Sequence, residues 1–219
     1  MKVKGLMTIT KSRIEGKKLD EQRGFTLLEM LVVIAMALVI AATAAPTMTQ
    51  VVSNARIRGT MSGMATYTQR VRADAIRTNT TKSIWNILSS GEYMVYSADG
   101  NNTAPGLTGA DGVMPAGKQV VYVGNPTSSN VPAILDTMMA FGADPSAISV
   151  ANGAISFNSR GIPCYWDTTT GACQNSGTQA FVWYYVFQPP FGSNRWAALS
   201  VSPAGRIKNW YWDGAAWKN

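Results

Sequence analysis

Residues 25–45 form a continuous apolar run near the start of the chain. Every residue from Phe25 to Ala45 is apolar or small, with the exception of Glu29. The run has 21 residues, which as an α-helix span about 31 Å, and this length matches the hydrocarbon core of a bilayer. The pattern therefore predicts a transmembrane helix over residues 25–45.

A second helical pattern, of amphipathic character, follows over residues 46–80. Pro46 has no backbone N–H and its ring clashes with the preceding turn, so we expect the helix to kink or loosen near residues 42–46. Apolar residues then recur at spacings of three and four, which predicts a stripe that packs on the chain's own C-terminal part. The stripe comprises Met61, Met64, Ala65, Thr68, Val71 and Ala75. Five arginines fall largely off this stripe and are expected to face solvent, with neighbouring proteins or phospholipid head groups as alternatives: Arg56, Arg58, Arg70, Arg72 and Arg77.

Short β-type runs separated by turn residues replace the helical pattern after Thr81. They predict a β-rich globular head over residues 81–219. We expect residues 98–117, rich in Gly, Ala, Asn and Pro, to form a long loop, and residues 132–141 to form a short helix within another loop. The fold class is thus α+β, a long N-terminal helix packed on an antiparallel β-rich head. The predicted strands are 83–88, 93–97, 119–123, 154–158, 180–188, 197–201 and 206–212.

The composition argues against catalysis as the main role. The chain contains no His, the commonest general base and metal ligand, and only two Cys, too few for a structural zinc site. The acidic residues of the chain are scattered and show no recognised catalytic spacing. We therefore expect no enzyme activity, no metal and no cofactor.

The positive charge is concentrated at the two ends of the chain. Residues 1–24 hold seven Lys/Arg against three Asp/Glu, a net charge of +4, and residues 25–194 are neutral. The last 25 residues hold four Lys/Arg against one Asp, a net charge of +3. Because basic residues flanking an apolar span stay in the cytoplasm, the rest of the chain is expected to be exported.

Three interpretations of the N-terminal segment compete. Ala42-Thr43-Ala44 fits the small-x-small pattern of a secretory cleavage site, but a long charged region and a carboxylate argue against a plain signal peptide. A simple membrane anchor leaves Glu29 unexplained, since a carboxylate buried without a partner costs several kcal/mol. In the third interpretation the cut falls between Gly24 and Phe25, so that Glu29 lies one helical turn from a new N-terminal amine.

The stretch Gly24-Phe25-Thr26-Leu27-Leu28-Glu29 resembles the type IV prepilin signature. The resemblance implies that residues 1–24 are a leader, that a prepilin peptidase cleaves after Gly24, and that Phe25 is N-methylated. It also implies a pilin-like fold, a Glu at the fifth mature position, and a Pro at the place of Pro46. A carboxylate and an ammonium from two subunits would relieve each other's desolvation and fix the register between helices.

Cys164 and Cys173 flank eight residues that fit a turn. An even cysteine count in an exported chain favours a disulfide, which would stabilise the fold by roughly 3 kcal/mol. The alternative is a pair of free thiols.

The C-terminal residues 195–219 combine cations with large aromatics. Ser202-Pro203-Ala204-Gly205 is a turn signal, so the flanking runs predict a hairpin. Alternation puts Arg206, Lys208, Trp210 and Trp212 on one face, and Ile207, Asn209 and Tyr211 on the other. With Arg195, the cations and indoles could hold phosphates and stack bases. Alternatively the tryptophans are core residues and the cations lie over them in cation–π pairs.

Residues 155–161 and 199–208 resemble the C-terminal region of FimT-type minor pilins and GspH-type pseudopilins. In FimT-type proteins a Gly-Arg-x-Arg motif is linked to DNA binding; here Gly205, Arg206 and Ile207 match, and Lys208 replaces the second Arg. The resemblance implies a subunit of a type IV pilus-like filament, with DNA uptake or, alternatively, type II secretion as its context. The implied partners are other pilins or pseudopilins, the prepilin peptidase, an inner-membrane assembly platform, DNA and the lipid bilayer. The implied location is the bacterial inner membrane with the head in the periplasm, and then the filament.

Overall fold

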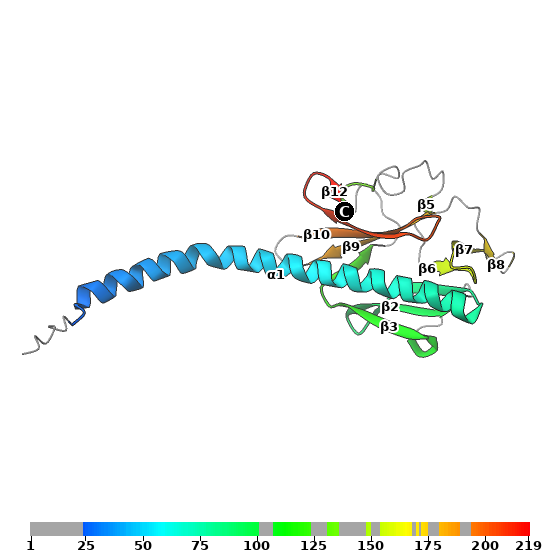
Figure 1. The fold of residues 1–219 in the computed structure, drawn as a ribbon, viewed down its shortest axis with the longest axis horizontal. Coiled ribbons are helices and arrows are strands. Elements are labelled where there is room, and N and C mark those ends of the chain that lie inside the picture. The colour runs from blue at the N-terminus through cyan, green and yellow to red at the C-terminus, as the bar shows by residue number, and fades with distance from the viewer. Residues whose placement is uncertain are drawn as a thin grey trace, which may run out of the picture. The chain divides into compact units, whose positions relative to one another are not determined.

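The computed structural model describes residues 24–100, 107–123, 131–135, 148–149, 154–167, 170, 172–174, 180–188 and 194–219. Side chains are not described at residues 43–47, 49, 148–149 and 165–167. The chain divides into two compact units, residues 1–44 and residues 45–219. The second unit, residues 45–219, is called the head from here on and contains all the strands found in the described residues (Figure 1).

Helix α1 runs from Leu27 to Thr78. Its start is set by Thr26, whose hydroxyl oxygen accepts a hydrogen bond from the Glu29 N–H at 3.2 Å, as an N-cap residue does. Its end is set by Asn79, which adopts a positive φ of 53°, while the Thr80 N–H bonds back to the Ala75 carbonyl at 3.2 Å. This is the Schellman pattern, in which Asn tolerates the left-handed conformation. The helix is continuous through Pro46, and the kink expected there stays a prediction.

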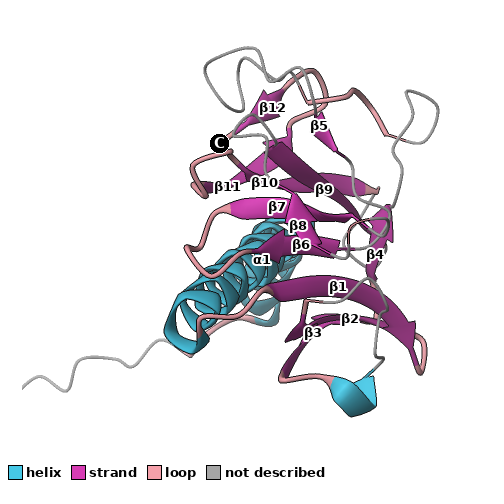
Figure 2. Cartoon of the chain, turned by 90° about the vertical axis from the view of Figure 1, so that its right-hand side faces the viewer, coloured by secondary structure: helices cyan, strands magenta, loops and turns pink. Residues whose placement is uncertain are grey.

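The strands of the head form two sheets that lie beside α1 (Figure 2). In the described residues one sheet has the order β3-β2-β1-β6-β7-β8, and the other has the order β12-β11-β10-β9-β4, with β5 pairing in parallel to β9. The strands of the first sheet are β1 Lys82–Ser89, β2 Glu92–Asp99, β3 Gly112–Gly117, β6 Ala154–Phe157, β7 Pro163–Asp167 and β8 Ala172–Gln174. Those of the second are β4 Val120–Val123, β5 Ile148–Ser149, β9 Ala180–Phe187, β10 Arg195–Val201, β11 Ile207–Trp212 and β12 Trp217–Lys218.

The main core lies between α1 and the two sheets. The predicted helical stripe supplies Met61, Met64, Val71 and Ala75, each at most 2% exposed, and these pack with side chains from both sheets. A second cluster covers the opposite face of the second sheet and includes Val182, Tyr184 and Trp210. Because the second sheet is covered on both faces, every residue of β9 is buried.

The structure corrects two expectations for the head and adds strands that were missed. The expected loop over residues 98–117 contains the end of β2, the short 3-10 helix η1 at Leu107–Gly109 and all of β3. Residues 132–135 are not helical, and residues 136–141 lie outside the described part. The seven predicted strands are present as β1, β2, β4, β6, β9, β10 and β11, whereas β3, β5, β7, β8 and β12 were not predicted.

The predicted disulfide between Cys164 and Cys173 is present, with 5.6 Å between the two Cα atoms. It links β7 to β8, which pair as an antiparallel hairpin at the end of the first sheet. The bridge therefore stabilises a hairpin whose outer strand has only three residues.

Candidate functional site

The first unit presents apolar side chains that the unit itself does not cover. Phe25 is 69% exposed and Leu27 is 84% exposed. The apolar residues that follow in α1 are similarly open, among them Leu31 at 59% and Ile40 at 68%. An apolar surface of this kind marks a contact with other proteins or with lipid. Within the residues whose side chains are described, we find no helix that combines the length and the apolar character needed to cross a bilayer.

Glu29 is the acidic residue in the first turn of α1. Its side chain is exposed, and no ion pair of the described residues involves it. A carboxylate at this place interacts favourably with the positive end of the helix dipole. The Thr26-x-x-Glu29 spacing is also that of a capping box, a signal for the helix start that our sequence analysis did not use.

The C-terminal hairpin forms as predicted, with a tight turn between β10 and β11. Two backbone hydrogen bonds close the turn. The Gly205 N–H donates to the Ser202 carbonyl at 2.7 Å, and the Ser202 N–H donates to the Arg206 carbonyl at 2.8 Å. Ser202 also accepts the Arg206 N–H on its hydroxyl oxygen at 3.0 Å. Gly205 has φ of +79°, a conformation that favours glycine at this position.

The tryptophans of β11 pack inside the head. Trp210 is 3% exposed, and its indole N–H donates to the Ser200 hydroxyl at 2.9 Å. Trp212 packs against the second core cluster, with its ring 5.5 Å from that of Trp217. Lys208 Nζ lies over the Trp210 ring at 5.2 Å from its centroid. The predicted alternation is correct, but a buried Trp210 has no open face on which a base could stack.

The three candidate cations of the hairpin region do not form one patch. Arg206 and Lys208 lie at the turn end of β11, where Ile207 pairs with Val201. Arg195 begins β10 at the opposite end, and its guanidinium donates to the Asn54 side-chain oxygen of α1. Arg206 lies five positions before Tyr211 in the chain, which corresponds to about 17 Å along the strand. Arg206 is exposed, whereas Arg195 is half-buried.

Arg72 has a structural role that our sequence analysis missed. Its Nε donates to the Gly161 carbonyl at 2.7 Å, and its Nη1 donates to the Gly205 carbonyl at 2.9 Å. Nη2 reaches the Ala204 carbonyl at 3.3 Å. Arg72 therefore does not belong to a solvated face: it ties α1 to the loop after β6 and to the β10–β11 turn.

Substitution of Gly205 tests how closely this turn fits Arg72. A Cβ at Gly205 would lie 2.7 Å from Arg72 Cζ, at a φ of +79°. We expect Gly205→Ala to lower the free energy of unfolding by about 2 kcal/mol, through backbone strain and displacement of the guanidinium. Gly214→Ala is the matched control, because Gly214 also has positive φ but a Cβ there would meet nothing within 4 Å. Equal thermal unfolding temperatures for the two variants would contradict the assignment.

Comparison with known proteins identifies one segment of the chain. The family model of the prokaryotic N-terminal methylation motif matches residues 20–45. No curated protein and no solved structure matches the chain. Residues 20–45 thus carry a type IV prepilin-like signature, which includes Gly24, Phe25 and Glu29.

Proposed function

From the methylation motif at residues 20–45, we propose that this protein is a minor subunit of a type IV pilus-like filament. A prepilin peptidase removes residues 1–24, cutting between Gly24 and Phe25, and the new amine of Phe25 is methylated. The mature chain is then a structural subunit and an enzyme substrate, with no catalytic role, metal or cofactor of its own.

We further propose that residues 25–45 hold the precursor in the inner membrane, with the head in the periplasm. The support is the apolar run itself, the basic residues that precede it, and the exposure of its side chains, such as Leu27 at 84%. In the filament the same side chains would pack against neighbouring helices. Glu29 would then meet the N-terminal amine of a neighbouring subunit, and Pro46 would mark a kink beyond the apolar run.

Cell fractionation tests this role. In cells with the prepilin peptidase, we expect the shortened protein both in the inner membrane and among filaments sheared from the cells. In cells without the peptidase, we expect the uncut precursor in the membrane only. Uncut protein in sheared filaments, or shortened protein in peptidase-deficient cells, would contradict the proposal.

Two machines could assemble such a subunit, a type IV pilus or a type II secretion system. The resemblance of residues 155–161 and 199–208 covers both the FimT and the GspH types. Deletion of the gene, scored for piliation, natural transformation and secretion of folded proteins, separates them. We expect loss of piliation or transformation with normal secretion; loss of secretion alone would assign the chain to the secretion system.

A second candidate function is sequence-independent DNA binding at the turn end of the hairpin. The observation that favours it is the exposed Arg206 next to Lys208, in a C-terminal stretch of net charge +3. Because Trp210 is buried, the contact would be to phosphates and not to stacked bases.

We expect the affinity of the full chain for DNA to fall steeply with salt, since counterion release supplies the binding energy. The double substitution Arg206→Ala and Lys208→Ala should lower the affinity about tenfold and flatten the salt dependence by roughly two charges. Mobility-shift titrations at several salt concentrations measure both. Arg70→Ala, an exposed arginine of α1, is the control; salt-independent binding, or equal losses in both variants, would reject DNA binding at this site.

A further inference from the structure

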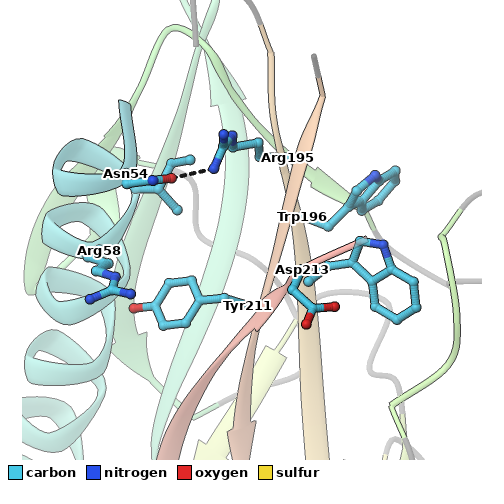
Figure 3. A pocket seen from close by; sticks show the side chains of 8 residues that line it. Asn54, Arg58, Arg195, Trp196, Tyr211 and Asp213 are labelled. Carbon is cyan, nitrogen blue, oxygen red and sulfur yellow. Dashed lines mark hydrogen bonds between the residues drawn. The ribbon is translucent and has the colours of Figure 1, made fainter. Parts of the chain in front are cut away.

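A small hollow opens between α1 and the strands β10 and β11, at the end of the hairpin away from the turn (Figure 3). Its volume is about 210 Å³. The helix side contributes Asn54 and Arg58, and the sheet side contributes Arg195 and Tyr211, whose ring reaches toward the helix. Trp196 and Trp212 complete the wall on the sheet side.

Two guanidinium groups lie beside this hollow, that of the half-buried Arg195 and that of the exposed Arg58. The Arg195 guanidinium donates to the Asn54 side-chain oxygen, and the Arg58 guanidinium lies 5.8 Å from the centre of the Tyr211 ring. Neither arginine takes part in any of the ion pairs found among the described residues. The hollow therefore holds two positive charges that form no ion pair with a carboxylate of the described residues.

Asp213 carries the one carboxylate among the residues that line the hollow, and it is already engaged. It forms an ion pair with Lys218 and accepts the backbone N–H groups of Ala215 and Ala216 at 2.9 Å and 2.8 Å. Lys218, and then these two N–H groups, hold the pKa of Asp213 well below its usual range. Asp213 is thus fully ionised at neutral pH and its charge is balanced by Lys218, not by the two arginines.

Tyr211 adds a neutral donor to the two cations. Burial raises the pKa of its phenol, although Arg58 acts in the opposite direction. The hydroxyl is therefore protonated at neutral pH and can donate a hydrogen bond to an anion. Two guanidinium forks and one hydroxyl around a small space form a donor set suited to a carboxylate.

The size of the hollow indicates what kind of group enters it. Sites for whole small molecules are typically about 300–1,000 Å³, so a space of about 210 Å³ fits one side chain. A second hollow of about 520 Å³ continues along the same face and shares Arg58, Tyr211, Trp212 and Asp213 with the first. The two together give room for an acidic side chain and for the peptide that carries it.

We propose that this hollow binds an acidic peptide: a Glu or Asp side chain of a partner protein that enters between Arg58, Arg195 and the Tyr211 hydroxyl. The site lies at the opposite end of β11 from Arg206 and Lys208, so it is distinct from the candidate DNA contact. All the residues that line the site belong to the head. The proposal therefore does not depend on the filament role.

Binding of a labelled peptide to the full chain in detergent micelles tests the site. The probe is a fluorescein-labelled peptide of alternating Gly and Glu, and a peptide of alternating Gly and Gln is its control. We expect the Glu peptide to bind and the Gln peptide not to. Arg58→Gln and Arg195→Gln should each weaken binding about tenfold, the effect of one charge-assisted bond, and Tyr211→Phe about threefold. Arg206→Gln, at the far end of β11, should change nothing.

Two further arms keep the outcome unambiguous. Arg58→Lys and Arg195→Lys keep the charge without the planar fork, so they should retain part of the affinity that the Gln variants lose. A short DNA duplex is added as a competitor. The proposal fails if the Glu peptide binds no better than the Gln peptide, or if the Arg58 and Arg195 variants bind like Arg206→Gln. The proposal also fails if DNA displaces the peptide and the affinity for DNA falls in the Arg58→Gln and Arg195→Gln variants. The hollow would then be a nucleic-acid site.

Discussion

Glu29→Gln is expected to leave cleavage and methylation intact while the amount of this subunit in sheared filaments falls about tenfold or more. Removing one partner of a buried ion pair costs roughly 3 kcal/mol, because the other charge stays buried without compensation. In the proposed filament that charge is the Phe25 amine of a neighbouring subunit. Cleavage cuts the bond between Gly24 and Phe25 and does not involve the Glu29 carboxylate, so the loss should appear only at the step of filament incorporation.

Quantitative immunoblots of membrane and filament fractions measure this effect. Glu92→Gln is the matched control, because Glu92 begins β2 in the head and lies outside the apolar run. It should enter filaments at the normal level. If Glu29→Gln and Glu92→Gln are incorporated equally, the carboxylate at position 29 has no role in assembly. If Glu29→Gln is not cleaved, its effect belongs to processing instead.

Arg72→Ala is expected to destabilise the head strongly. The substitution leaves the carbonyls of Gly161, Gly205 and Ala204 without the guanidinium that they share. Hydrogen bonds from a charged donor contribute about 1.5–3 kcal/mol each in favourable cases. Since Arg72 is only half-buried, we expect a total loss of about 3 kcal/mol, which corresponds to a fall of about 9 °C in Tm for a chain of this size.

Thermal unfolding followed by tryptophan fluorescence measures this loss, because several tryptophans lie in the core clusters. Arg70→Ala is the control, as Arg70 lies on the same helix but is exposed, and its Tm should stay close to that of the wild type. Arg72→Lys should give an intermediate Tm, because an ammonium group cannot reach three carbonyls in the same plane. A Tm for Arg72→Ala equal to that of Arg70→Ala would show that the guanidinium contacts do not hold α1 to the loop after β6 and the β10–β11 turn.

The elements that were predicted correctly are those in which a single periodicity dominates. The stripe of Met61, Met64, Val71 and Ala75 on α1 repeats over several turns. Residues 180–187 are apolar or aromatic throughout, because β9 is buried on both faces. Strand β3 was missed for a physical reason. It contains Pro115 between two glycines, a composition typical of a loop. However, β3 is an edge strand of its sheet, and an edge strand tolerates a residue that has no backbone N–H.

Among the candidate site residues, those defined by a local pattern were predicted, and those defined by contacts between distant segments were not. The signature Gly24-Phe25-x-x-x-Glu29 is local, so the sequence alone predicts it, and the methylation-motif match covers it. The roles of Trp210 and Arg72 are not local. Alternation places Trp210 on one face of β11 correctly, but it does not say that the second cluster covers that face. Arg72 meets carbonyls 89 and 133 residues away in the chain, and no pattern around residue 72 indicates them.

The chemical identity of the mature N-terminus tests the central claim most directly. Mass spectrometry of the N-terminal peptide from protein purified out of the membrane or filaments identifies both the first residue and its modification. We predict a chain that begins at Phe25 and carries one methyl group on its α-amine. A chain that begins at residue 45, as cleavage after Ala42-Thr43-Ala44 would leave it, or one that retains residues 1–24, would contradict the account.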